Sequence, residues 1–181
     1  MHAGAVDPDM GIDPRRSDGE SCLMADSHPG IREQITGAIN GYLAVLKRPA
    51  GDSLRSLGEL ARALDQLVMC YHATPDIEPD TVESPAPRAD EASLTEAVRA
   101  AYPELGWYAL VDPDGDTDQE IGLTIATGNL SEIAVDLLEV LWLFDNASEN
   151  DAVWEFRLGY QTHWGRHLHE LRVYLHALAA W

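Results

Sequence analysis

Hydrophobic residues recur at three- and four-residue spacing in four long stretches of the chain, the pattern of helices that bury one face. The first stretch begins at Ile31 and stops before Pro49, because proline cannot continue a helix. The second has Asp52 or Ser53 as its N-cap and closes at Pro75. Both stretches therefore predict helices with a clear start and end.

The other two long helices lie in the C-terminal third of the chain. One is predicted to begin at a capping box of Asn129 and Glu132 and to extend to Phe144. The other is predicted to run unbroken from about Asp151 to the C-terminus. A short polar turn joins them, so the two helices are expected to be antiparallel neighbours.

The segment between the helical pairs is less regular. Ser93 and Glu96 form a second capping box, which predicts a short helix that ends near Pro103. The apolar segments 107–111 and 121–126 are candidates for short strands. The sequence as a whole predicts an all-α fold, an up-and-down bundle of four main helices plus one short helix.

Two segments carry no helical pattern. Residues 1–29 are rich in proline and glycine and are predicted to be a disordered leader. Residues 74–92 are rich in proline and acid and are predicted to be a long exposed loop. We therefore expect a single helical-bundle domain over residues 30–181.

Charge narrows the range of partners. The 181 residues include 31 Asp and Glu against 12 Lys and Arg, a net charge of −19. Such a chain lacks the basic surface that nucleic acids or anionic membranes require, so neither is an expected partner. Most of the excess falls in residues 1–29, 74–92 and 112–120, where its simplest role is to keep exposed chain in solution.

Cysteine use and hydropathy bear on location. Cys22 and Cys70 lie far apart and outside any CxxC pattern, which favours a reducing compartment over a disulfide framework. The N-terminus lacks the basic start and apolar run of a secretory signal. The most apolar stretch, residues 133–144, is too short to cross a bilayer. The sequence therefore predicts a cytoplasmic protein.

The C-terminal helical pair resembles a bacterial family known as domain of unknown function 5063. The resemblance covers residues 95–180 well and the first two helices loosely, and the segment 107–113 matches an aromatic-Asp-Pro element of the family. Departures are Ala134, where the family often has an aromatic residue, and the acid-rich segment 112–120. The resemblance implies a fold and no particular activity. The residues that carry it are Asp136, Glu139, Asp151, Trp154, Arg157, His163, Trp164, Gly165 and His167.

Two polar stripes with matching spacing are the first candidate site. His163, His167 and Glu170 share one face of the last helix at i, i+4 and i+7. The preceding helix repeats this spacing, and counting from the turn places the two stripes at the same level. The residues of that second stripe are Glu132, Asp136 and Glu139.

Two interpretations of these stripes stay open. Two imidazoles facing Glu132 and Asp136 could hold a transition metal, as in carboxylate sites within helical bundles. The acidic stripe, however, lies opposite the apolar face of its helix, which favours surface acids and hydrogen-bonded histidines instead. Neither HExxH nor the Glu-x-x-His pairs of di-iron bundles occur in the sequence.

Arg157 is the second candidate, because it lies within the apolar stripe of the last helix. A buried guanidinium needs a partner, and Asp136 and Asp112 are the candidate carboxylates for an ion pair that fixes helix register. The alternative is a pocket in which Arg157 anchors an anionic ligand beside three ring side chains, those of Tyr160, Trp164 and His167.

Two further patterns have simpler interpretations. The alternating acids of residues 112–120 suggest a calcium loop, but Thr117 and Leu123 stand where an EF-hand needs Gly and Glu. Trp107, Trp154 and Trp164 are predicted to be core anchors.

No nucleophile motif or phosphate-binding loop is present. The sequence therefore favours a non-enzymatic cytosolic module that acts through protein contacts, with an unidentified partner or a second copy in a dimer, and needs no cofactor. The alternative is a metal-binding protein or metal-dependent hydrolase, which would hold a divalent metal with His163, His167, Glu132 and Asp136.

Overall fold

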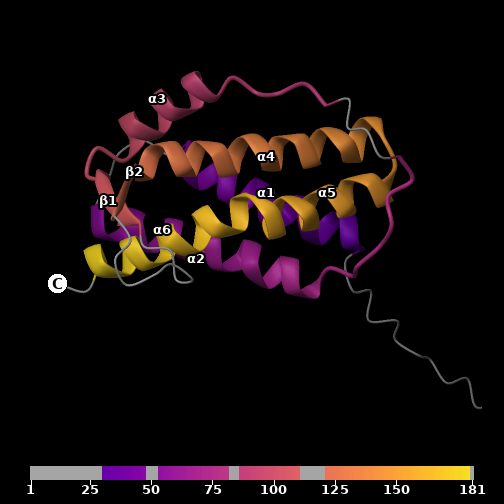
Figure 1. The fold of residues 1–181 in the computed structure, drawn as a ribbon, viewed down its shortest axis with the longest axis horizontal. Helices are drawn as coiled ribbons and strands as arrows, with labels where there is room; N and C mark the ends of the chain where they lie inside the picture. Colours follow the sequence, from indigo (N-terminus) through magenta and orange to yellow (C-terminus); the bar gives the residue numbers. More distant parts are fainter. Residues whose placement is uncertain (1–29, 48–52, 82–85, 111–120, 180–181) are drawn as a thin grey trace, which may run out of the picture.

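The computed structural model describes residues 30–47, 53–81, 86–110 and 121–179. These residues form a helical bundle with one small two-stranded sheet (Figure 1), which confirms the predicted fold class. The predicted leader, Cys22 and the acidic segment 112–120 lie outside the described residues. The elements are α1 (Ile31–Leu46), α2 (Ser53–Ala73), α3 (Glu91–Ala101), β1 (Trp107–Leu110), β2 (Gly122–Ile125), α4 (Ala126–Asn146), α5 (Glu149–Thr162) and α6 (Trp164–Ala179).

The helix α4 is the centre of the bundle. It contacts α1, α3, α5 and α6, so its buried residues surround most of the helix instead of forming one stripe. Figure 1 shows α3 along one side of α4, with α5 and α6 running back along another. Tyr42 of α1 is fully buried, and its hydroxyl donates to the carbonyl of Leu130 in α4 at 2.7 Å. The large apolar residues that α4 contributes to the core are Leu130, Ile133, Leu137, Val140, Leu143 and Phe144.

Two helix starts differ from the predictions. The helix α4 begins at Ala126 directly after β2, so Asn129 lies inside it and is not a cap. The helix α3 is capped by Asp90, whose carboxylate accepts from the N–H of Ser93 at 3.2 Å. In both places the sequence has the capping-box pattern, but the helix begins a few residues before it. The predicted ends before Pro49, Pro75 and Pro103 agree with the structure.

The two candidate strands form an antiparallel hairpin in which Trp107 pairs with Ile125 and Ala109 with Leu123. The side chain of Trp107 lies on the outer face of this hairpin and the residue is 66% exposed, so the prediction that it anchors the core is wrong. Trp164 is fully buried, as predicted, and Trp154 is half-buried. In the described part of the chain, no helix combines the length and the hydropathy that a bilayer crossing needs.

Candidate metal centre

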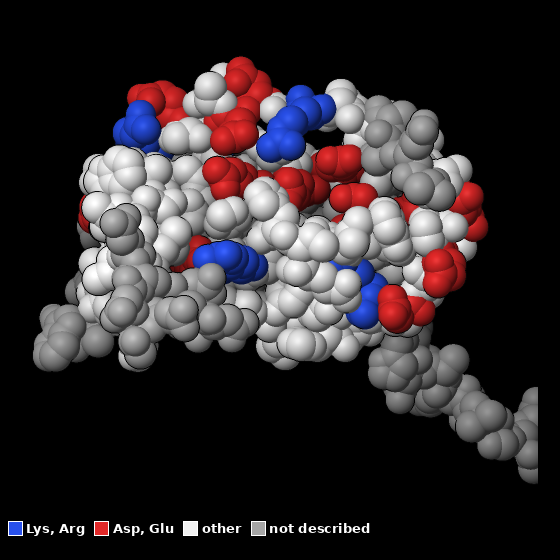
Figure 2. Space-filling view, viewed as in Figure 1, with Lys and Arg blue, Asp and Glu red and all other residues white. Residues whose placement is uncertain are grey.

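The position of the acidic stripe opposite the apolar residues of α4 predicts that it faces open solvent. In the structure it does not. Because α5 and α6 pack beside α4, Glu132 and Asp136 are half-buried in the seam between these helices. Figure 2 shows acidic side chains in a row along this part of the surface. The seam therefore brings the two predicted polar stripes together.

Each histidine of the seam contacts one carboxylate of α4. The Nδ1 atom of His163 lies 2.6 Å from Oδ2 of Asp136, and Nε2 of His167 lies 3.0 Å from Oε2 of Glu132. The two imidazole rings are 5.0 Å apart, edge to face. One ligand atom each from Glu132, His163 and His167 lies within 4.8 Å of the other two. Imidazole nitrogens and carboxylate oxygens are donor types that transition metals accept, so these residues are a candidate metal-ligand set.

A further carboxylate lies behind His167. The Nδ1 atom of His167 is 3.8 Å from Oε2 of Glu170, and both atoms are buried without a hydrogen-bond partner in the structure. The other oxygen of Glu170 accepts from Nε of Arg166 at 2.8 Å. The His167 ring is thus placed between two carboxylates, with Glu132 on its Nε2 side and Glu170 on its Nδ1 side.

The helix that was predicted to run unbroken from Asp151 ends and restarts at His163. This residue has φ −143° and ψ −82°, outside the helical region, and its N–H still donates to the carbonyl of Gly159 at 2.9 Å. Trp164 turns into the core directly after it. The break presents the His163 ring to Asp136 from the end of α5 instead of from the side of a continuous helix.

Two glycines make room for this break. A Cβ atom on Gly159 would lie 2.8 Å from the indole of Trp164, and one on Gly165 would overlap the carbonyl oxygen of Tyr160. Such contacts are shorter than side chains allow, so both positions require glycine while α5 and α6 approach this closely. The sequence signal for the break was therefore the pair of glycines around the buried tryptophan.

Negative charge accumulates along the seam. Burial raises the pKa of Glu155 on α5, and the nearby carboxylates of Glu139 and Asp136 raise this pKa further. A cation in the seam would relieve this repulsion, because it would offset charge that the protein alone leaves close together.

Arg157 has partners other than those predicted. Its Nη1 donates to the carbonyl of Thr74 at 2.6 Å, its Nε lies 3.4 Å from Asp76, and its guanidinium lies over the ring of Tyr71. The predicted ion pair with Asp136 is wrong, because that carboxylate faces His163, and Asp112 lies outside the described residues. Arg157 closes the C-terminal end of α2, where exposed carbonyls attract a cation.

The predicted anion pocket around Arg157 is divided among separate contacts. Tyr160 stacks on Tyr71 with ring centroids 3.7 Å apart, and its hydroxyl lies 2.7 Å from Nε2 of His169. Trp164 is buried against Phe156, and His167 faces Glu132. Tyr160 therefore belongs to the contact between α2 and α5, and His167 belongs to the seam between α4 and α6.

One polar network beside the seam is not predicted by the sequence. Asn129, predicted to be a cap, is buried and donates from Nδ2 to the hydroxyl of Tyr108 at 2.7 Å. Its Oδ1 accepts from the hydroxyl of Thr124 at 2.8 Å. Burial, together with the charge of Glu170, raises the pKa of Tyr108, so this phenol keeps its proton. Only the packing of the hairpin on α4 brings these residues together.

Comparison with known proteins establishes the family. A family model described as "Domain of unknown function (DUF5063)" matches residues 28–180. The chain belongs to this family. No curated protein matches it. The crystal structure of protein BF1032 from Bacteroides fragilis is similar, with a TM-score of 0.64 and 15% identity over 82% of this chain and 92% of that chain. At this identity the similarity shows the fold alone.

The family-type residues of the C-terminal helices have distinct places in the structure. Asp136, His163 and His167 lie in the seam, and Gly165 allows the close approach of α5 and α6. Asp151 lies elsewhere, and its carboxylate accepts from the N–H of Thr81 at 2.8 Å. In this member of the family, the motif thus combines a polar site with residues that hold the helices in position.

Proposed function

We propose that the protein binds one divalent transition-metal ion between α4 and α6, with Glu132, His163 and His167 as ligands. The observation that carries this proposal is the convergence of their ligand atoms within 4.8 Å. Metal–ligand bonds of about 2.0–2.1 Å place neighbouring ligand atoms roughly 3.0–3.4 Å apart. A small adjustment of three side chains, one on α4, one on α6 and one at the break between α5 and α6, would close the site.

The surrounding carboxylates support the proposal. Histidines that bind metal usually give their second ring nitrogen to a carboxylate, which orients the ring and raises its basicity. Asp136 holds Nδ1 of His163, which leaves Nε2 for the metal, and Glu170 lies on the Nδ1 side of His167. The two buried atoms that lack partners, Nδ1 of His167 and Oε2 of Glu170, would meet as the ring moves onto the metal.

The donor types indicate which metals fit. Two imidazoles and one carboxylate suit zinc or iron(II), whereas magnesium and calcium prefer oxygen ligands alone. Three protein ligands leave at least one coordination position for water or a substrate oxygen. This is the arrangement that a metal-dependent hydrolase requires.

Metal content tests the proposal directly. Protein purified without a polyhistidine tag is expected to contain, or to take up after dialysis, one zinc or iron per chain. The double variant His163→Ala/His167→Ala should lose this metal, while the control His72→Ala/His176→Ala, which removes two exposed histidines, should keep it. Equal metal content in the two double variants, or no uptake by the wild type, would overturn the proposal.

We also propose, as a second candidate, that the outer face of the hairpin contacts another protein or a second copy of this chain. It exposes large apolar side chains, with Trp107 66%, Ile121 68% and Leu123 68% exposed. Exposed aromatic and aliphatic residues of this kind are typical of interfaces. Light scattering and pull-down with wild type and with Trp107→Ser/Leu123→Ser test this candidate, since a monomer with no reproducible partner contradicts it.

A further inference from the structure

A hollow of about 340 Å³ lies between β1 and α6, next to the proposed metal centre. Figure 1 shows β1 beside the C-terminal half of α6. The volume lies within the range of small-molecule sites, which are typically about 300–1,000 Å³ and mainly apolar. The residues that form the hollow include Tyr108, Leu110, Glu170, Val173, Tyr174 and Ala177.

The walls of the hollow are held in place before any ligand arrives. The rings of Tyr108 and Tyr174 stack with centroids 4.8 Å apart. The hydroxyl of Tyr174 accepts from the N–H of Gly106 at 3.1 Å, and the hydroxyl of Tyr108 accepts from Asn129. A site whose walls are fixed in this way loses little conformational entropy when it binds a ligand.

The hydrogen bonds around Asn129 also determine which group the hydroxyl of Tyr108 can donate to. Because Thr124 donates to Oδ1 of Asn129, the amide group presents its Nδ2 to Tyr108, and the phenol oxygen acts as an acceptor. The O–H proton of Tyr108 is therefore left for another partner. Over the ranges that the structure describes, no side chain or carbonyl accepts it. A ligand oxygen in the hollow would complete the hydrogen bonds of this phenol.

The hollow and the metal centre share one face of α6. Glu170 lines the hollow and also lies behind His167, and Tyr174 follows His167 by seven residues, or about 10 Å along the helix. A molecule in the hollow therefore contacts Glu170, which lies on the Nδ1 side of the His167 ring, whereas the metal would bind on the Nε2 side.

The charges select the kind of ligand. Glu170 is the charged residue of the lining, and Glu132 and Asp136 lie beyond it, so an anionic ligand would meet repulsion. We propose that the hollow binds an uncharged, ring-containing molecule whose carbonyl oxygen accepts the Tyr108 proton. Resting on the proposed function, we also propose that a molecule in the hollow changes the surroundings of the metal through Glu170 and the His167 ring, without contacting the metal.

Dye binding to the metal-free protein tests the hollow. Nile red is uncharged and carries a ring carbonyl, so it should bind saturably, whereas the anionic dye anilinonaphthalene sulfonate should bind at least about tenfold more weakly. Ala177→Trp fills the hollow and should weaken Nile red by about tenfold or more. Tyr108→Phe should weaken it by about threefold to tenfold through the lost hydrogen bond.

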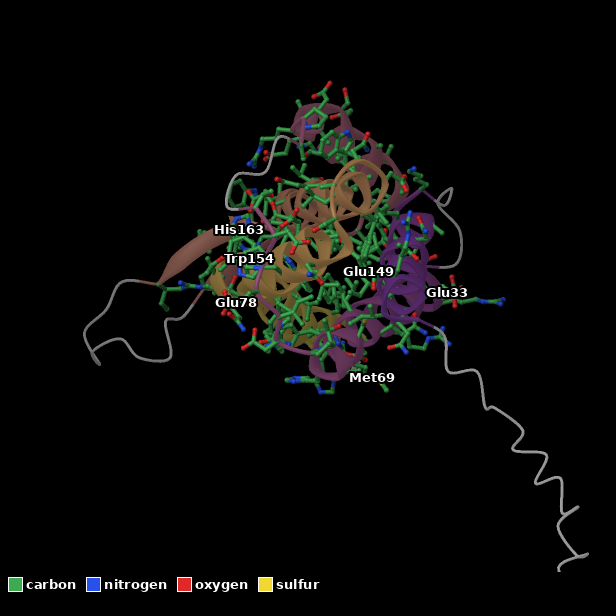
Figure 3. The ribbon with its side chains drawn as sticks, turned by 90° about the vertical axis from the view of Figure 1, so that its right-hand side faces the viewer. Glu33, Met69, Glu78, Glu149, Trp154 and His163 are labelled. Atoms are coloured by element: carbon green, nitrogen blue, oxygen red, sulfur yellow. The ribbon has the colours of Figure 1, made fainter. Side chains whose placement is uncertain are left out.

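Two controls keep the result specific. Met69→Trp introduces the same indole on α2, where Met69 is exposed away from the hairpin (Figure 3), and should leave Nile red binding unchanged. Leu123→Ser removes an apolar side chain from the outer hairpin face and should also leave it unchanged. Loss of binding in Leu123→Ser with retention in Ala177→Trp would overturn the assignment of the hollow, as would equal affinity for the two dyes.

The effect on the metal has its own readout. Cobalt(II) in place of zinc should show a changed visible spectrum when Nile red analogues without visible absorbance, such as uncharged aryl ketones, are added. An unchanged spectrum with intact dye binding would refute this effect on the metal and leave the hollow as a binding site. Absence of cobalt uptake would refute the proposed function itself while the dye result still decides on the hollow.

Discussion

The Nδ1 atom of His163 lies 2.6 Å from Oδ2 of Asp136, a contact that joins the break between α5 and α6 to the central helix α4. It holds the imidazole in one orientation, with the opposite nitrogen available to a metal. Carboxylates in this position typically contribute about 10–100-fold to metal affinity.

Asp136→Asn is expected to weaken zinc binding by about 10–100-fold with little change in fold, because an amide orients the His163 ring less strongly than a carboxylate. Zinc titration by calorimetry measures this change. Asp145→Asn is the matched control at the far end of α4, where Asp145 pairs with Arg32 at the surface. Equal affinities for the two variants would contradict the role given to Asp136.

Gly165→Ala should destabilise the protein by about 3 kcal/mol, because its Cβ would overlap the backbone of Tyr160 at the helix break. Gly37→Ala places the same methyl group on α1 with nothing within 4 Å, and should instead stabilise by about 0.5–1 kcal/mol. Urea denaturation of both variants gives the two free energies of unfolding. A neutral Gly165→Ala would mean that α5 and α6 do not approach as described.

Glu155→Gln should make the metal-free protein more stable at neutral pH. Burial and the charges of Glu139 and Asp136 raise the pKa of Glu155 in the folded state, so the folded protein holds this proton more tightly than the unfolded chain. The wild-type penalty is present above the folded-state pKa and disappears as the pH falls below the unfolded one.

Thermal melting against pH measures this effect. The gain in Tm for Glu155→Gln should be on the order of 1–2 °C at pH 7, because the position is only half-buried and solvent screens the repulsion. The two melting curves should converge near pH 4. A gain that grows on acidification would show that the sign is wrong.

Asn129→Ala should cost about 1–3 kcal/mol, since it leaves the buried hydroxyl of Tyr108 and the half-buried hydroxyl of Thr124 without their amide partner. Asn40→Ala, at an exposed position of α1, should change stability little. Urea denaturation compares the two. If Asn129→Ala were no more destabilising than its control, the hairpin would not be tied to α4 through this network.

Much of the fold was predictable because its signals are local. The helix ends at Pro49, Pro75 and Pro103 follow from the geometry of proline, and the two stripes that form the seam follow from helical periodicity. Counting outward from the turn brought the two stripes to the same level, but it matched Glu132 with His163, whereas the structure pairs Glu132 with His167 and Asp136 with His163.

The remaining features depend on tertiary packing. The break at His163 arises where Trp164 turns into the core. The spacing of apolar residues does not reveal this break, because it continues across it. Arg157 found its partners at the end of α2, more than 80 residues away along the chain. Asn129 resembled a cap because Glu132 follows it at capping-box spacing, but its helix begins one turn earlier, directly after a strand. These three features depend on contacts between distant segments, which residue spacing does not encode.

Anomalous diffraction from crystals of the zinc-loaded protein tests the central claim most directly. The account predicts a single strong peak per chain, about 2.0–2.2 Å from a carboxylate oxygen of Glu132 and from Nε2 of both His163 and His167. A peak elsewhere on the chain, or none at saturating zinc with both rings ordered against Glu132 and Asp136, would contradict it.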